Sequence, residues 1–243
     1  VSAIIGTALP DRTISRVIND EHGLLWLKIG TEVIVLNTVN SKVIDRMDVM
    51  GGAFLLNVPQ GGILIAQGSG IHRASMQQGR IRLEPLNYPG LQRALLDQVD
   101  RIAADATGQL WSSYLNSGVR VWTAEGERPL GEGWEILARA GPKLGAVVLL
   151  QHGRLLITSN LGLLEVDPDT HALLRIHTRH DGLPDDHIYG VLLEGDSAWW
   201  ISTNNGLCRA RIEEGRGLLD VRIFSTKDGL QSKEFNGQAW FRS

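Results

Sequence analysis

Cysteine is almost absent from this sequence, since Cys208 is the only one among 243 residues. One cysteine cannot form an intramolecular disulfide and excludes a metal site built from several cysteines. Long apolar runs are also absent: the longest, AVVLL at 146–150, is far shorter than the roughly 20 residues of a membrane-spanning helix. Basic residues are not in excess, because the formal net charge is −3. A nucleic-acid-binding surface needs a basic face to neutralise phosphates, so the charge argues against that class of protein.

No secretory signal segment is visible, and the chain begins at Val1 rather than at methionine. We therefore expect the chain to be a piece of a longer polypeptide. Its composition, with 43% hydrophobic and 21% charged residues, is that of a globular protein large enough for one or two domains.

What the sequence does contain is a repeat. Short runs rich in leucine, β-branched and aromatic residues alternate with turns of Gly, Asn and Asp, and this pattern is typical of a protein with many β-strands. Five runs recur at intervals of about 44 residues, and they are centred on Trp26, Leu64, Trp111, Leu156 and Trp200. A second landmark keeps the same spacing, because LPDRTI at 9–14 and LPDDHI at 183–188 are 174 residues apart, as are Trp26 and Trp200.

Each unit reads as four short strands, which in the fifth unit we expect at 187–194, 198–203, 207–212 and 218–225. Four antiparallel strands in about 44 residues indicate a β-propeller blade. The predicted fold class is therefore all-β, a β-propeller with four-stranded antiparallel blades at 7–47, 50–87, 97–140, 144–180 and 185–226.

Partial blades are expected at both ends, at 1–6 and at 234–243, so that the chain would be a fragment of a larger ring of about seven blades. Large side chains must fill the gaps between stacked blades, and we expect Trp26, Trp111 and Trp200 to do so. A glycine follows the second strand in four of the five units, at a turn that needs positive φ; these are Gly70, Gly118, Gly162 and Gly206.

The fifth unit, DGLPDDHIYGVLLEGDSAWWISTNNGLCRARI, resembles the two-component regulator propeller repeat of bacterial membrane sensors. The matching residues are Asp181, Gly182, Leu183, Pro184, Ile188, Trp200, Ile201, Thr203, Gly206 and Leu207. The first and third units carry the pattern in part, whereas the second and fourth lack the tryptophan and match only in outline. The closing DGLQSKEFNGQAWFRS is similar to the last-blade start that precedes an Ig-like domain in these sensors.

The resemblance implies a periplasmic, non-enzymatic sensor region whose ligand is an unidentified small molecule or glycan. It implies as partners the rest of the same propeller, a following Ig-like domain and, as one option, a second copy in a homodimer. It implies no cofactor and no contact of this segment with nucleic acid or membrane. The output of such proteins is a cytoplasmic histidine kinase or diguanylate cyclase, and this sequence contains no signature of either. Two alternatives stay open: a protein-interaction or dimerisation scaffold, and a propeller enzyme like the streptogramin lyases, which use His, Glu and a divalent metal.

The segment HTRHDGLPDDH at 177–187 combines histidines with carboxylates, which are common metal ligands. We favour a structural interpretation, because Asp181 and the glycine after it recur at Asp228 in a later copy of the linker, and both residue types form turns. His177 and His180 are three residues apart, which in an extended chain points them to opposite faces. No metal site is predicted here.

Other motifs do not indicate catalysis. The segment DPDTHA at 167–172 lacks the glycine and the final carboxylate of a calcium loop and is predicted to be a hairpin turn. There is no G-x-S-x-G motif, no Walker loop and no dinucleotide fingerprint. No catalytic residue is predicted.

In propellers, ligands usually meet the loops that lead into the innermost strand and the loops between the second and third strands. Here those loops carry short polar side chains that are suited to hydrogen-bonding a polar ligand. The predicted ligand-binding residues are Asp11, Asn116, Asn160, Asp185, Asp186, His187, Asn204 and Asn205. Three tryptophans outside the repeat, Trp122, Trp134 and Trp240, are better candidates for an exposed role than the periodic ones.

Overall fold

The computed structural model describes residues 14–50, 52–58, 62–68, 70–95, 99–105, 107–114, 118–137, 143–149, 154–194, 198–213 and 216–235. The predicted partial blade at 1–6, most of the one at 234–243, and the predicted ligand residues Asp11 and Asn116 lie outside the described residues. The chain forms two compact units, one made of Val1–Asp97 with Ala124–Gly126 and the other of Gln98–Thr123 with Glu127–Ser243.

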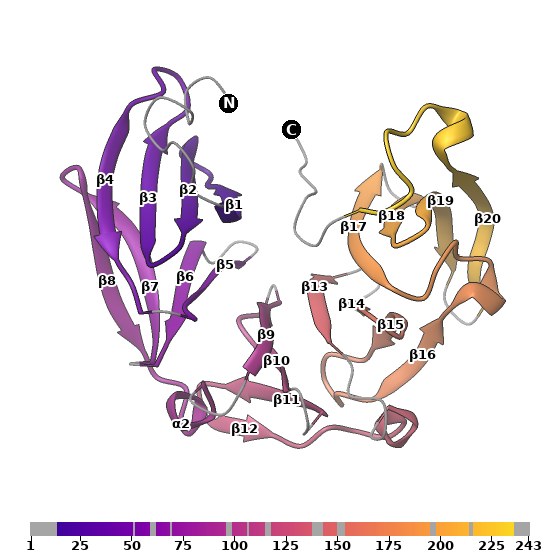
Figure 1. Cartoon of the computed structure of the whole chain (residues 1–243). Coiled ribbons are helices and arrows are strands. Elements are labelled where there is room, and N and C mark those ends of the chain that lie inside the picture. Colours follow the sequence, from indigo (N-terminus) through magenta and orange to yellow (C-terminus); the bar gives the residue numbers. More distant parts are fainter. Residues whose placement is uncertain are drawn as a thin grey trace. The chain divides into compact units, whose positions relative to one another are not determined.

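The first unit contains two four-stranded antiparallel sheets (Figure 1). The first sheet consists of β1 (Ile14–Asn19), β2 (Leu24–Ile29), β3 (Glu32–Asn37) and β4 (Val43–Asp48). The second consists of β5 (Phe54–Val58), β6 (Gly62–Gln67), β7 (Gly70–Gln77) and β8 (Arg80–Leu86). A short helix, α2 (Leu91–Leu95), follows the second sheet and buries Leu91 and Ala94.

The second unit contains three more four-stranded sheets. The third sheet consists of β9 (Val99–Ala104), β10 (Leu110–Tyr114), β11 (Gly118–Thr123) and β12 (Gly126–Arg128). The fourth consists of β13 (Leu144–Leu149), β14 (Leu155–Ser159), β15 (Gly162–Val166) and β16 (Leu173–His177). The fifth consists of β17 (Ile188–Glu194), β18 (Ala198–Thr203), β19 (Gly206–Glu213) and β20 (Gly217–Phe224). Three 3-10 turns, η1 (Trp134–Ile136), η2 (Arg179–Asp181) and η3 (Thr226–Asp228), follow the third, fourth and fifth sheets.

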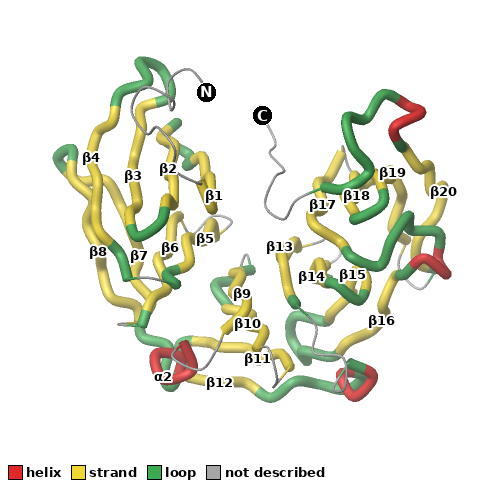
Figure 2. Tube along the Cα trace, in the orientation of Figure 1, coloured by secondary structure: helices red, strands yellow, loops and turns green. Residues whose placement is uncertain are grey.

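In every sheet the strands pair in the order in which they occur along the chain, joined by tight turns and loops (Figure 2). This up-and-down order, repeated in five separate sheets, is that of propeller blades, so the prediction of an all-β propeller is confirmed. The four strands expected in the fifth unit are also confirmed, each within one residue at either end. Among the described residues, no helix is long and apolar enough to cross a membrane.

Two tryptophans of the repeat lie between stacked blades, as predicted. Trp26 is 1% exposed and belongs to a core cluster that also contains Ile65 of the second sheet. Trp111 is fully buried in a cluster that contains Ile157 of the fourth sheet. In both cases, the second strand of one blade directs its tryptophan toward the blade that follows in the sequence.

Trp200 is not enclosed between described blades: its ring is partly exposed and lies 5.2 Å from the ring of Phe224 in its own sheet. Its neighbour Trp199 is the buried one and packs in the core between the fourth and fifth sheets. Trp200 has the same strand register as Trp26, and its side chain therefore points to the face that a following blade would cover. Within the second unit, no described sheet covers that face of the fifth blade.

Cys208 lies on the opposite face of the fifth blade, which packs against the fourth. Its side chain is fully buried in a cluster that contains Leu156 of β14 and Ile201 of β18. Burial raises the pKa of the Cys208 thiol to about 12, because the thiolate would lose its hydration in this apolar contact. The cysteine is therefore a small core residue at a blade interface.

A recurring acidic residue holds the hairpin between the first two strands of a blade. The carboxylate of Asp105, which is 1% exposed, accepts hydrogen bonds from the backbone N–H groups of Thr107 and Gln109, from the Thr107 hydroxyl, and from Nε1 of Trp111 at 3.1 Å. Asp20 in the first blade binds the equivalent indole, that of Trp26, at 2.8 Å. The same spacing of six residues thus joins the turn to the tryptophan in both units.

Glycines begin the third strand in the fourth and fifth blades, where the chain leaves a turn with positive φ. Gly162 has φ of 132°, and a Cβ there would lie 2.6 Å from the carbonyl oxygen of His177. Gly206 has φ of 114°, and its Cβ would lie 2.7 Å from the carbonyl oxygen of Phe224. In the fourth and fifth blades the missing side chain therefore lets the third strand approach the backbone of the fourth strand.

A buried hydrogen bond joins a histidine and a glutamate inside the fourth blade. Nε2 of His177 on β16 lies 3.2 Å from a carboxylate oxygen of Glu165 on β15, and both residues are buried. The hydrogen bond with His177 lowers the pKa of Glu165, burial opposes this shift, and the positive charges of Arg175 and Arg154 add to it. The ionised carboxylate is therefore favoured in the folded state.

We expect Glu165→Gln to lower the free energy of unfolding at pH 7 by about 1 kcal/mol, because a charge-assisted hydrogen bond is replaced by a neutral one. Since the pKa is lowered on folding, this contribution is present above the unfolded pKa of about 4.3 and disappears as the pH falls below it. Urea denaturation from pH 7 to pH 3 measures the difference. The exposed Glu213→Gln is the control, and an equal, pH-independent loss in both variants would contradict the assignment.

Candidate functional site

The strand register brings two loops of each blade to one end of its sheet. In the fifth blade, Ile188 at the start of β17 pairs with Thr203 at the end of β18, which pairs in turn with Gly206 at the start of β19. The segment before β17 and the turn between β18 and β19 therefore lie side by side. The fourth blade has the same arrangement, because Leu144 pairs with Ser159 and Ser159 with Gly162.

At this end of the fifth blade, three predicted ligand residues come together with a tyrosine. The carboxylate of Asp185 accepts a hydrogen bond from the backbone N–H of His187 at 2.8 Å. The carbonyl of His187 accepts one from the N–H of Asn204 at 3.0 Å, and the side-chain oxygen of Asn204 accepts one from the Tyr189 hydroxyl at 3.1 Å. The rings of His187 and Tyr189 lie 4.7 Å apart.

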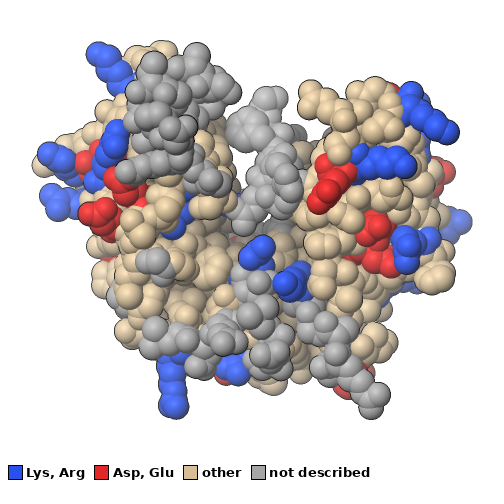
Figure 3. Space-filling view, in the orientation of Figure 1, with Lys and Arg blue, Asp and Glu red and all other residues tan. Residues whose placement is uncertain are grey.

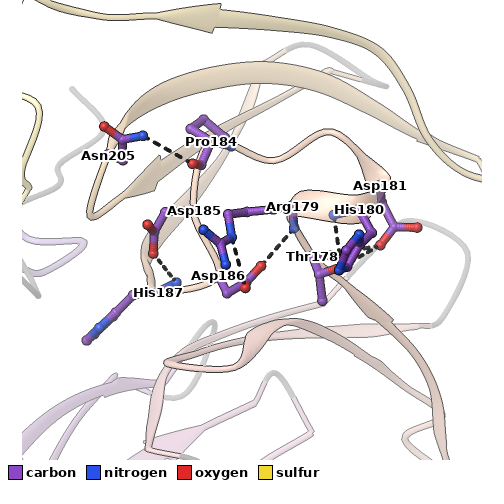
Figure 4. A network of polar contacts seen from close by, with 9 residues as sticks. All are labelled: Thr178, Arg179, His180, Asp181, Pro184, Asp185, Asp186, His187 and Asn205. Carbon is purple, nitrogen blue, oxygen red and sulfur yellow. Dashed lines mark hydrogen bonds and ion pairs between the residues drawn. The ribbon is translucent and has the colours of Figure 1, made fainter.

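The imidazole of His187 points away from the carboxylates of the preceding linker (Figure 4). The side chain is partly exposed, and Asn204 beside it is exposed. Burial raises the pKa of Tyr189, and the negative charges of Glu234 and Asp185 add to this effect, so that its hydroxyl stays a hydrogen-bond donor. Among the described residues, His187, Tyr189 and Asn204 thus form an accessible polar group with an aromatic face, which we call the fifth-blade cluster.

Two of the predicted ligand residues have structural partners instead. The carboxylate of Asp186 accepts a hydrogen bond from the backbone N–H of Arg179 at 2.7 Å and pairs with its guanidinium at 3.2 Å (Figure 4). The side chain of Asn205 reaches back to the carbonyl of Pro184 at 3.4 Å. Both residues hold the linker in place beside the fifth-blade cluster.

Asn160 occupies in the fourth blade the turn position that Asn204 has in the fifth. Its side-chain oxygen accepts a hydrogen bond from the backbone N–H of Lys143 at 2.7 Å, which fixes the segment before β13. Asn160 therefore lies at the corresponding end of the neighbouring blade, and its side-chain oxygen is already bonded to a backbone N–H group. Asp11 and Asn116, the other two predicted ligand residues, lie outside the described residues.

The structural interpretation of the DGL linker is confirmed. The Asp181 carboxylate accepts hydrogen bonds from the N–H and hydroxyl of Thr178 at 2.8 and 3.1 Å and so caps η2, and Gly182 ends the turn with φ of 104°. Ser225, Asp228 and Gly229 repeat this capping box around η3.

The histidines of this segment diverge. His177 is buried against Glu165, whereas His180 is exposed on η2 (Figure 4). DPDTHA is also a hairpin turn as predicted, since Asp167 accepts hydrogen bonds from the backbone N–H groups of Asp169 and Thr170 between β15 and β16. These carboxylates hold turns together.

Trp122 and Trp134, two of the three candidates for an exposed role, are buried. Trp122 is 2% exposed and donates its indole N–H to the Ser112 hydroxyl at 2.9 Å. Trp134 is 7% exposed, donates to the carbonyl of His171 at 2.8 Å and stacks on Trp111 with a centroid separation of 6.3 Å. Both indoles satisfy their polar atom inside the protein, so packing explains them. Trp240 lies outside the described residues.

The visible surface carries a mixture of charges. Lys and Arg side chains are interspersed with Asp and Glu side chains over each unit (Figure 3). Exposed ion pairs of this chain include Arg209 with Glu194 at 2.5 Å and Arg179 with Asp186 at 3.2 Å. Such pairs contribute little to stability but keep a surface soluble.

No protein-family model matches the sequence, and no curated protein matches it. Solved structures do match, at low sequence identity. The extracellular domain of a protein assigned as a hybrid two-component system of B. thetaiotaomicron superposes with a TM-score of 0.64 and 15% identity, over 93% of this chain and 30% of that one. The extracellular domain assigned to a one-component system of the same organism gives 0.59 and 14%, over 92% and 33%. The chain therefore spans about a third of these domains.

Propellers of other functions match as well. Virginiamycin B lyase from Staphylococcus aureus gives a TM-score of 0.57 and 15% identity, over 89% of this chain and 71% of that one. A structure of the Mitotic Checkpoint Complex gives 0.62 and 14%, over 92% and 67%. At such identities the likeness concerns the fold, and together with the five up-and-down sheets it shows that this chain is a β-propeller of four-stranded blades.

Proposed function

We propose that this chain is a non-enzymatic, extracytoplasmic sensor propeller of a bacterial transmembrane signalling protein, and that the fifth-blade cluster takes part in binding its ligand. The observation that supports this proposal best is the cluster itself. It places an imidazole, a tyrosine hydroxyl and an amide at the end of a blade where two loops meet, and His187 has no ion-pair partner among the described residues. The likeness to extracellular domains of bacterial signalling proteins favours a sensor.

The chemistry of the cluster favours a polar, uncharged ligand such as a glycan or a small hydroxylated molecule. Hydroxyl groups bind well to amide and imidazole groups, and an aromatic face can stack against the apolar side of a sugar ring. The ring pair of His187 and Tyr189 offers such a face, with rings that lie 4.7 Å apart.

A thermal-shift screen with oligosaccharides and small polar metabolites tests the proposal on the purified chain. A ligand that binds only the folded state raises its stability, by about 2.7 kcal/mol at a concentration of 100 Kd. We expect at least one compound to raise the melting temperature in a concentration-dependent manner, with EDTA making no difference. A screen without any such compound would contradict the proposal. Consumption of the compound in a metal-dependent manner would favour the lyase class instead.

Variants of the cluster show whether binding uses it. We expect His187→Ala and Asn204→Ala each to weaken binding about 2- to 10-fold, because each removes one hydrogen bond or ring contact to the ligand. Exposed residues of the same types, changed in His22→Ala and Asn40→Ala, are the matched controls and should bind like the unmodified chain. Isothermal titration measures the affinities. Unchanged affinity in both cluster variants would show that the ligand binds elsewhere.

A further inference from the structure

The first blade carries two cations that face each other across β1 and β2. Arg16 and Lys28 are directly paired in the register of these strands. Side chains opposite each other in an antiparallel pair have Cβ atoms about 4.5–5.5 Å apart, and like charges in this position destabilise the sheet. β1 and β2 run side by side in Figure 1, so the pair lies within one sheet of the first unit.

Lys28 is buried, and Arg16 is partly buried. Lys28 is only 7% exposed, and its ammonium donates to the carbonyl of Gly30. Nε of Arg16 is buried without a hydrogen-bond partner. Burial lowers the pKa of each side chain, which reflects the loss of hydration around the charge. Within the described part of the chain, no carboxylate forms an ion pair with either residue, so the two positive charges lack a counter-charge.

The other blades provide an internal control for this arrangement. Lys28 is the penultimate residue of the second strand, and in the remaining four sheets that position holds small residues, namely Ala66, Ser113, Thr158 and Ser202. The residue opposite is Phe54 in the second sheet, Arg101 in the third and Gly190 in the fifth, so the third sheet has one cation at this pair of positions. The fold therefore does not need a cation here, and only the first blade places two.

The pairing of β1 with β2 is irregular beside Arg16. The register of β1 and β2 shifts between Ile14 and Arg16, and the fifth blade has an equivalent shift between Ile188 and Gly190. Bulges re-aim a side chain and are frequent beside binding sites. Arg16 lies near the start of β1, and Lys28 lies near the turn to β3, at the same end of the first blade as the fifth-blade cluster has in its own blade.

We propose that Arg16 and Lys28 form a binding site for one oxyanion group, a carboxylate, sulfate or phosphate carried by a small molecule. A guanidinium presents a planar set of donors that fits an oxyanion, and an ammonium adds a point charge beside it. An anion would supply the missing counter-charge and recover the energy lost by burying two unpaired cations. The site lies wholly within the first unit and is independent of the fifth-blade cluster.

Titration calorimetry of the purified chain with sodium sulfate, sodium phosphate and sodium glucuronate tests this site. Sodium chloride at matched ionic strength and neutral glucose serve as comparisons. We expect at least one oxyanion to bind, and Arg16→Gln and Lys28→Met each to weaken its binding about tenfold or more, since each removes a charge-assisted contact. The three probes distinguish which oxyanion chemistry the site prefers.

The double variant Lys42→Met and Arg46→Gln is the matched control, because it removes two exposed cations from the same blade. It should bind the oxyanion as the unmodified chain does. Without anion, Lys28→Met should melt at or above the temperature of the unmodified chain, because the methionine keeps the apolar stem and removes a buried charge.

The proposal is overturned by any of three results: no oxyanion binds better than chloride, the control loses binding equally, or Lys28→Met is clearly destabilised. We expect His187→Ala to leave oxyanion binding unchanged. This result would distinguish the oxyanion site from the fifth-blade cluster.

Discussion

Replacing Gly162 with alanine is expected to lower the free energy of unfolding by about 2–5 kcal/mol. The added Cβ would lie 2.6 Å from the carbonyl oxygen of His177 and 2.7 Å from a methyl group of Ile176, and the residue has φ of 132°. An L-residue is strained at this φ, and the backbone oxygen cannot move away without breaking the pairing of β15 with β16. For a chain of this size, the melting temperature should fall by about 2–4 °C per kcal/mol. Urea denaturation and thermal melting measure the loss.

Two other turn glycines distinguish the effect of the steric clash of the added Cβ from the effect of the strained φ angle. Gly206→Ala should be as severe as Gly162→Ala, because its Cβ would meet the carbonyl oxygen of Phe224 at 2.7 Å. Gly118 occupies the same place in the third blade with φ of 79°, but no described atom lies within 4 Å of its added Cβ. Gly118→Ala should therefore cost only about 1–2 kcal/mol. Equal losses at Gly118 and Gly162 would show that close approach of the strands is not the reason.

Asp105→Ala is expected to destabilise the chain by about 3 kcal/mol or more, since it removes an acceptor that four donors share. The carboxylate is 1% exposed, and the indole N–H of Trp111 would remain buried without a partner. Two backbone N–H groups in the hairpin would also lose their acceptor. Chemical denaturation gives the loss, and near-ultraviolet circular dichroism reports the environment of the tryptophan.

Two comparisons test the cause of this loss. Asp20→Ala should cost less, about 1–2 kcal/mol, because Asp20 is partly exposed and water can replace the acceptor of the exposed backbone N–H groups, although the Trp26 indole also loses its partner. Trp111→Phe removes the indole donor, so its combination with Asp105→Ala should be less destabilising than the sum of the two single changes. Strict additivity would mean that the hydrogen bond between these residues contributes nothing.

The blade architecture could be predicted from the sequence because several signals repeat together. Strand runs, turn glycines and the LPD linker all keep one spacing, so an error in one unit is corrected by the others. The sequence does not show what covers a side chain. Trp199 and Trp200 are adjacent and point to opposite faces, and only the packing of the fourth blade shows that Trp199 is the buried one. Trp134 lies outside the repeat, yet it is buried because η1 folds it onto Trp111.

The candidate site could be predicted only in part. The loop positions of His187 and Asn204 follow from the repeat, but the sequence does not show that Asp186 is committed to Arg179. Short acidic and amide side chains form hydrogen bonds with the backbone as readily as with a ligand. Only the geometry of the folded chain shows which of the two partners a given side chain has. Tyr189 was missed, although it follows His187 at the start of a strand beside the turn. A comparison of equivalent strand positions would have singled out Lys28, since the other four blades hold small residues there.

The buried Cys208 gives this protein a built-in reporter of blade separation. As the only cysteine, it lies in the contact between the fourth and fifth blades, with a pKa raised to about 12. A thiol reagent at neutral pH can reach it only when that contact opens, so the rate of labelling gives the free energy of local opening under native conditions. The same measurement with ligand present would show whether binding at one end of a blade stabilises the contact between the two blades. A slower labelling rate would indicate this, and no engineered label is needed.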